Sequence, residues 1–96
     1  MHSIDHYVDR ALAKKRFKSD RQLSTALGLS LAAVGSWRTR RAIPSEESMV
    51  KLAEFAGMDA EIALLELGWW RSVSRNEHAA ATTYQKLIAH HAHMAA

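Results

Sequence analysis

Two short helical patterns separated by Gly28 constrain the fold of this chain more than any other feature. They lie within residues 19–45, which read SDRQLSTALGLSLAAVGSWRTRRAIPS. The first pattern covers about residues 20–27 and the second about residues 31–38. Glycine adopts the left-handed backbone conformation that ends a helix without a Cβ clash. The stretch therefore predicts two short helices joined by a tight turn.

Polar side chains stand where each of these helices should begin. Ser19 or Asp20 can cap the first helix and Ser30 the second, because their oxygens accept hydrogen bonds from the N–H groups of a first helical turn. Gln22 lies three residues after Ser19, which is the spacing of a capping box. These signals support the expected helix boundaries.

The apolar residues of both helices recur at spacings that place them on one face. In the first helix the inward residues should be Leu23, Ala26 and Leu27, and in the second Ala33, Val34 and Trp37. The second helix then turns a small, uncharged face outward, made of Leu31, Ala32, Gly35 and Ser36. Three arginines follow this face closely, at positions 38, 40 and 41. The major groove of B-DNA accepts one α-helix, and such a slim helix beside arginines could approach a polyanion closely.

The stretch resembles the helix-turn-helix of the Cro/C1-type (XRE-like) transcriptional regulators, including phage repressors. The matching residues are Leu23, Ser24, Leu27, Gly28, Ser30, Val34, Trp37, Pro44 and Ser45. A looser match extends from about Ile4 to Leu67. The resemblance implies an all-α fold: a five-helix, lambda-repressor-like DNA-binding domain over residues 1–70, with an additional C-terminal helix in residues 71–96.

The resemblance also implies which residues meet DNA. The positions that face bases are Leu31, Ala32, Gly35 and Ser36, of which Leu31 and Ala32 can pack on thymine methyl groups and Ser36 can donate or accept a hydrogen bond. Because this set is poor in bidentate donors, part of the sequence preference should come from DNA shape. The expected phosphate contacts, which position the protein, are Arg21, Arg38, Thr39, Arg40 and Arg41.

Two positions depart from the family pattern. The family often has Gln, a phosphate contact, where this chain has Asp20, and an Asp there is better suited to capping because it would repel phosphate. The family usually has Gly after the recognition helix, where this chain has Arg40. We therefore expect that end of the helix to differ in shape and Arg40 to gain reach toward the DNA backbone.

Charge is divided unevenly along the chain. Residues 1–44 hold nine Lys or Arg against three Asp, whereas residues 45–96 hold four against seven acidic residues. This division indicates a cationic face on the half that carries the helix-turn-helix. An ordinary solvated surface is the alternative interpretation of the charge pattern alone.

The remaining segments also predict helices. The first should run from about Ser3 to Phe17, a fourth should follow Ser45 and end at Gly57, and a fifth should begin after Asp59. Their apolar residues are expected in the core, in particular Met49, Phe55, Ile62, Leu64, Leu65 and Leu67. Trp69 and Trp70 point about 100° apart on a helix, so one can enter the core while the other lies at its boundary.

A final helix is expected from Ser74 to about His93, capped by Ser74 or Asn76. One face carries Ala80, Tyr84, Leu87, Ile88 and His91. This face either covers the domain within the chain or meets a second copy, and the sequence leaves both open. Residues 92–96 should fray.

No pattern for catalysis, cofactor or metal binding is evident. The chain has no cysteine, no glycine-rich phosphate loop, no nucleophile elbow and no HExxH motif. His90, His91 and His93 lie near the end of the last helix, where solvated histidines are the simpler interpretation. We expect no enzyme, no cofactor and no metal site. No apolar run resembles a signal peptide or a membrane span, so the expected location is the bacterial cytoplasm, at the nucleoid.

These observations predict a sequence-specific DNA-binding transcriptional regulator, a phage- or prophage-type repressor that occludes a promoter as a homodimer on double-stranded DNA. One alternative is an antitoxin-like autoregulator whose C-terminal helix binds a partner protein. Another is a protein-interaction module on a helix-turn-helix scaffold without a DNA role.

Overall fold

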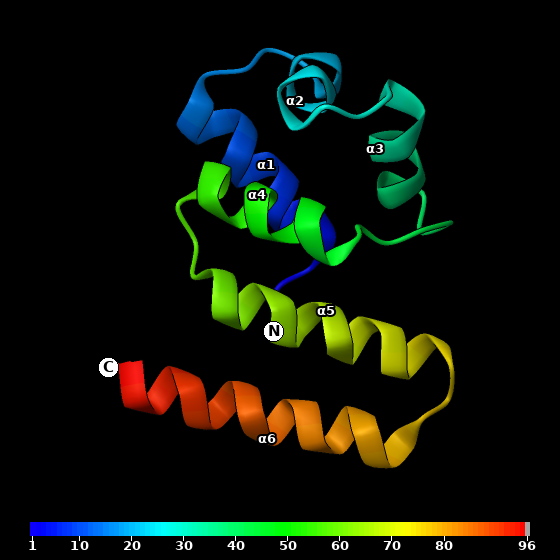
Figure 1. Cartoon of the computed structure of the whole chain (residues 1–96), viewed down its shortest axis with the longest axis vertical. Coiled ribbons are helices and arrows are strands. Elements are labelled where there is room, and N and C mark those ends of the chain that lie inside the picture. The colour runs from blue at the N-terminus through cyan, green and yellow to red at the C-terminus, as the bar shows by residue number, and fades with distance from the viewer. Residues whose placement is uncertain (96) are drawn as a thin grey trace.

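The computed structural model describes residues 1–95. In that range the chain forms six α-helices and no β-strand, which confirms the all-α fold class (Figure 1). None of these six helices is long and apolar enough to cross a membrane. The helices are α1 (Ile4–Lys15), α2 (Asp20–Leu27), α3 (Leu31–Arg38), α4 (Glu46–Ala56), α5 (Ala60–Ser74) and α6 (His78–Ala95).

The predicted tight turn between α2 and α3 is present. The hydroxyl of Ser19 accepts a hydrogen bond from the Gln22 N–H, and Ser30 does the same for Ala33, so Ser19 rather than Asp20 is the first cap. The side chain of Gln22 accepts from the N–H of Lys18 at 2.6 Å, one residue earlier than in a standard capping box. Gly28 ends α2 with φ of 73°, as its position in the sequence predicts.

The core lies where α1 packs against α4, and the pair α2–α3 closes one end of it. Its fully buried side chains include Tyr7, Val8, Leu23, Val34, Met49 and Leu52. The expectation for α2 was wrong at one position, because Ala26 is exposed and Ser24 is buried instead. The Ser24 hydroxyl donates to the carbonyl of Arg21 at 2.8 Å, so its burial leaves no polar group unpaired.

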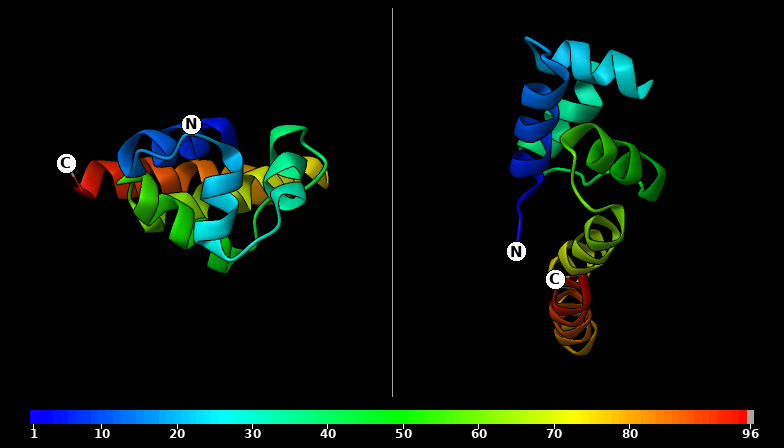
Figure 2. Two further views of the ribbon diagram at one scale, coloured as in Figure 1. Left: turned by 90° about the horizontal axis from the view of Figure 1, so that it is seen from above. Right: turned by 90° about the vertical axis from the view of Figure 1, so that its left-hand side faces the viewer.

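Helix α5 lies between α4 and α6 and forms a separate layer (Figures 1 and 2). Asp59 caps it by accepting from the N–H groups of Glu61 and Ile62. The helix continues through the expected domain boundary at residue 70 and ends at Ser74. Leu64, expected in the core, is 37% exposed and lines a shallow hollow with Glu46 of α4 and Tyr84 of α6.

Gly68 allows α5 and α6 to approach closely. A Cβ atom built on Gly68 would lie 2.4 Å from Cε1 of Tyr84, far inside van der Waals contact. Glycine at this position therefore makes room for the Tyr84 ring against the backbone of α5. It interrupts neither the helix nor the packing.

Helix α6 packs on α5 alone. It begins at His78, four residues later than expected, because Ser74 is still the last residue of α5 and Asn76 adopts a left-handed conformation in the turn between the helices. The face expected to be apolar is half-buried on α5 at Ala80, Tyr84, Ile88 and His91, whereas Leu87 stays 44% exposed. The expected fraying is not seen at residues 92–95, which are helical, and Ala96 lies outside the described residues.

Candidate nucleic-acid interface

Helix α3 presents the side chains that the sequence analysis expected to face outward. Leu31 is 41% exposed, Ala32 is exposed, and Gly35 and Ser36 are half-buried. On the opposite side, Val34 is fully buried and Trp37 is 4% exposed, while Ala33 is half-buried. The helix lies with α2 at the end of the molecule opposite α6 (Figure 2). Val34 and Trp37 thus face inward and Leu31 and Ala32 outward as expected, whereas Ala33 is no more buried than Gly35 and Ser36.

The outer face of α3 is smooth because its polar groups bond within the helix. The Ser36 hydroxyl donates to the Ala32 carbonyl at 2.9 Å, and the Thr39 hydroxyl donates to the Gly35 carbonyl at 3.1 Å. Beyond its chain neighbours and the backbone of its own helix, no heavy atom of the described chain lies within 4 Å of the point where a Cβ of Gly35 would stand. Glycine is therefore not required there by packing, and its effect is to thin the exposed side of the helix.

Arg38 does not extend freely from the end of α3. Its Nη2 atom lies 2.9 Å from the Asp9 carboxylate, and its Nη1 donates to Asp5 at 3.2 Å. Nε and Nη2 also form a two-point bond with Asp20, both at 3.1 Å. The guanidinium thereby joins α1, α2 and α3. The sequence analysis expected a phosphate contact here and did not predict these three partners.

Contacts within the charge cluster shift the pKa values of Arg38 and Asp5. The hydrogen bonds that Arg38 donates to Asp20, above all, raise the pKa of Arg38 beyond its usual range, although partial burial opposes this. Asp5 has a lowered pKa because Arg40, and then Arg38, donate to its carboxylate. Both shifts favour the charged forms of Arg38 and Asp5.

Arg40 adopts a left-handed backbone conformation with φ of 64°. This is the conformation that glycine tolerates best, and it lies at the position where the resembled family usually has Gly. The Arg41 N–H then returns to the Ser36 carbonyl at 2.9 Å. The Arg40 guanidinium donates to the Trp37 carbonyl at 3.1 Å and to Asp5 at 3.0 Å. Arg40 therefore closes the end of α3.

Two of the expected phosphate contacts have exposed side chains without an ion pair or hydrogen bond inside the described chain. These are Arg21, on α2, and Arg41, after α3. Thr39 is also exposed, with its hydroxyl bonded to α3. The three arginines at the end of α3 thus differ in their environments. Arg38 and Arg40 bond to carboxylates, whereas Arg41 has no such partner within the described chain.

A buried carboxylate that sequence reasoning missed lies away from this interface. Glu66 is 1% exposed, and it accepts hydrogen bonds from the Tyr7 hydroxyl and from the His2 N–H. The His2 ring nitrogen Nδ1 lies 2.8 Å from Oε1 of Glu66, the same oxygen that accepts from Tyr7. Burial, and next the hydrogen bond to Glu66, raise the pKa of Tyr7 above its usual range. An acidic residue between Leu65 and Leu67 was the available signal, since charged residues are rarely buried without partners.

One group of side chains could hold a metal ion. Asp59, Glu61 and His91 bring one ligand atom each to within 4.8 Å of one another. Nε2 of His91 lies 3.3 Å from Asp59 and 3.7 Å from Glu61. His91 therefore joins the end of α6 to the start of α5, rather than grouping with His90 and His93. The two carboxylates are exposed, and Asp59 already serves as the α5 cap.

No family model, curated protein or solved structure matches this chain.

Proposed function

We propose that this chain is a sequence-specific DNA-binding regulator of the Cro/C1 type, which acts as a phage- or prophage-like repressor and occludes a promoter as a dimer. In this proposal α3 is the recognition helix and enters the major groove. Leu31 and Ala32 pack on thymine methyl groups, Gly35 permits close approach, and Ser36 accepts or donates one hydrogen bond.

One observation supports this proposal above the others. The outer face of α3 carries small, uncharged side chains, although its inner face holds Val34 and Trp37 in the core. Two exposed arginines lie on the neighbouring segments, Arg21 on α2 and Arg41 in the loop after α3.

The environments of the arginines divide their roles. Arg21 and Arg41 have free guanidinium groups and are proposed to bind phosphates. Arg38 is proposed to set the angle of α3 against α1 and α2, because its donors already serve carboxylates. Arg40 closes the end of α3, and its guanidinium, which stays half-exposed, is proposed to reach a phosphate as well.

The salt dependence of binding tests the phosphate roles. Each phosphate contact that is lost should lower the slope of log K against log salt by about 0.9 on duplex DNA. We expect Arg21→Ala and Arg41→Ala each to weaken binding on every duplex by a similar factor and to lower the slope by about one unit. Lys86→Ala removes the same charge from α6, at the far end of the molecule, and should leave the slope unchanged.

Charge placed on the outer face tests the role of α3. Ala32→Glu should abolish binding to duplex, because a carboxylate would face the phosphates and bases, and the exposed position should leave folding intact. Ala89→Glu is the matched control, since it adds the same side chain at an exposed position of α6. Equal affinities of the two variants in fluorescence anisotropy with duplex DNA would refute the recognition role of α3.

A dimer is the second part of the proposal. Leu87 and Met94 stay exposed on α6 at a spacing of two helical turns, and they are the proposed contact. Two recognition helices about 34 Å apart would then meet successive half-sites. Analytical ultracentrifugation should show a dimer that Leu87→Glu converts to a monomer. If the protein sediments as a monomer both with and without operator DNA, the dimer is refuted. DNA binding by α3 is a separate claim, which the Ala32→Glu experiment tests.

A further inference from the structure

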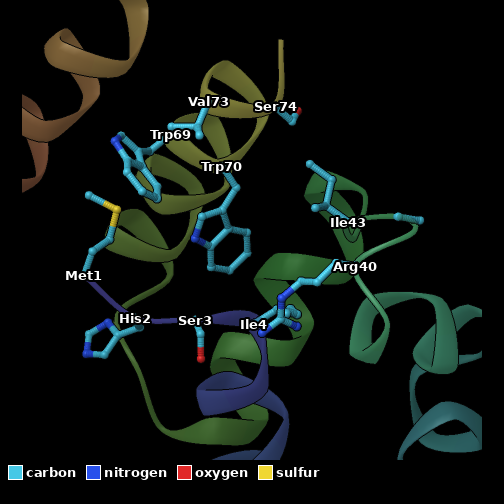
Figure 3. A pocket seen from close by; sticks show the side chains of 11 residues that line it. Met1, His2, Ser3, Ile4, Arg40, Ile43, Trp69, Trp70, Val73 and Ser74 are labelled. Atoms are coloured by element: carbon cyan, nitrogen blue, oxygen red, sulfur yellow. The ribbon is translucent and has the colours of Figure 1, made fainter. Parts of the chain in front are cut away.

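An apolar pocket lies between the N-terminal segment, α5 and the loop that follows α3 (Figure 3). Its volume is about 520 Å³, within the range of small-molecule sites. Its apolar walls come from Ile4, Ile43, Trp69, Trp70 and Val73, among others. The pocket is separate from the outer face of α3, although it shares the loop at which that helix ends.

The walls of the pocket are held in place by buried contacts. Glu66 fixes the N-terminal wall, since it accepts the backbone N–H of His2 at 2.6 Å. Trp70 packs edge-on against Tyr7, with ring centroids 6.1 Å apart, and its ring hangs from α5 toward Ile4 (Figure 3). Ile4 itself is buried. A ligand would therefore find much of the site already formed, which lowers the entropic cost of binding.

The lining of the pocket contains one arginine and no acidic residue. Arg40 reaches into the space from the opposite side of the pocket to Trp70 (Figure 3). A guanidinium has five N–H donors, and the contacts with Trp37 and Asp5 use only two of the donors of Arg40. The remaining donors suit a carboxylate, because Arg binds planar anions well.

We propose that this pocket binds a small aromatic monocarboxylate, with its ring against Trp69 and Trp70 and its carboxylate on Arg40. Flat aromatic faces gain from contact with indole rings beyond the area they bury. Arg40 already meets one carboxylate, that of Asp5, and its remaining donors favour a ligand that brings one further carboxylate. A second copy of the chain would instead cover the same side chains with a broad surface, and the experiment includes that outcome.

Isothermal titration calorimetry on the full chain tests the proposal with 2-naphthoate as the anionic probe and 2-naphthol as its uncharged counterpart. We expect saturable 1:1 binding of 2-naphthoate with Kd below about 1 mM and roughly tenfold weaker binding of 2-naphthol. Arg40→Gly, which suits the left-handed backbone, should weaken 2-naphthoate about tenfold and leave 2-naphthol nearly unchanged. Arg75→Ala, an exposed arginine outside the lining, should change neither, and circular dichroism verifies that both variants fold.

The location of binding is read from the indole N–H signals in ¹⁵N–¹H NMR spectra. The signals of Trp69 and Trp70 should shift with 2-naphthoate more than that of buried Trp37. The proposal is overturned by an absence of saturable binding, by equal affinity for the two probes, or by an Arg40→Gly variant that still prefers 2-naphthoate. It is also overturned if the Trp69 and Trp70 signals respond to dilution of the protein and not to the probe, because a second copy then occupies the surface.

Discussion

Arg38 holds the carboxylate of Asp20 in a two-point bond, with Nε donating to Oδ2 and Nη2 to Oδ1, both at 3.1 Å. Planar, two-point pairs of this kind are the most directional of the ion pairs. This one joins the first residue of α2 to the last residue of α3, and so it fixes the angle between the two helices of the proposed DNA-binding unit. Both side chains are less than one-third exposed, which limits screening by solvent.

Asp20→Asn should lower the free energy of unfolding by about 1 kcal/mol, because the amide keeps one acceptor and loses the charge and the second hydrogen bond. Urea unfolding followed by circular dichroism measures the change. Asp9→Asn is the control. Asp9 meets the same guanidinium through a single contact and is mostly exposed, so its replacement should cost less than about 0.5 kcal/mol. Equal effects of the two variants would contradict the importance of the two-point geometry.

The parts of the fold that could be predicted from sequence are those determined by local rules. The bounds of α2 and α3 agree with prediction because serine caps and Gly28 act within a few residues of themselves. The partners of Arg38 and Glu66 could not be predicted in the same way. Asp5 and Asp20 are 33 and 18 residues from Arg38, and Tyr7 is 59 residues from Glu66, so these contacts exist only once the helices pack.

The contrast between local signals and contacts distant in sequence also explains which glycine roles could be predicted. Gly28 ends a helix through its backbone conformation, and its place between the apolar pattern of α2 and the cap residue Ser30 predicts this role. Gly68 lies inside α5 and makes room for Tyr84 of another helix. Nothing in the residues next to Gly68 identifies that partner, because it lies 16 positions away on α6. Gly35, like Gly68, lies inside a helix, but it has open space where a Cβ would stand. Replacement by alanine should therefore change the free energy of unfolding in opposite directions at the two positions.

Gly35→Ala should raise the free energy of unfolding by about 0.5–1 kcal/mol, since alanine favours a helix and nothing opposes its methyl group. The proposed function adds a second expectation, which is weaker binding to duplex in spite of the greater stability. Thermal and urea unfolding measure the first effect and fluorescence anisotropy the second. A more stable variant with unchanged affinity would show that the backbone of α3 does not approach DNA closely.

Gly68→Ala should lower the free energy of unfolding by about 1 kcal/mol or more, because the new methyl group displaces the Tyr84 ring. A double-mutant cycle isolates the cause. In a Tyr84→Ala background the obstacle is gone, and Gly68→Ala should then become neutral or stabilising through helix propensity alone. A destabilising effect of the same size in both backgrounds would show that Tyr84 is not the obstacle.

Tyr7→Phe should cost about 1.5–3 kcal/mol of unfolding free energy, because it removes a donor from the buried carboxylate of Glu66 and leaves the ring packing intact. Tyr84→Phe is the matched control. The Tyr84 hydroxyl makes no hydrogen bond within the described chain, and its removal should change stability by less than about 0.5 kcal/mol. Urea unfolding at neutral pH compares the two, and a Tyr7→Phe variant as stable as the Tyr84→Phe variant would contradict the role assigned to Glu66.

Stability should fall in acid partly through the cap of α5. The backbone N–H of Ile62, followed by weaker contributions that include His91, lowers the pKa of Asp59 below its ordinary value, which is about 3.9. The unfolded chain therefore binds the proton more readily than the folded one. The stability that the Asp59 carboxylate contributes is thus present above about pH 4 and is lost as pH falls through the pKa of Asp59 in the folded chain.

Asp59→Asn keeps the capping oxygen and removes the titration. The fall in urea midpoint between about pH 5 and pH 2.5 should thus be smaller in Asp59→Asn than in the parent chain. Glu54→Gln, at an exposed position of α4, should leave that fall unchanged, and an identical acid response of Asp59→Asn and Glu54→Gln would exclude Asp59 as a source of the pH dependence.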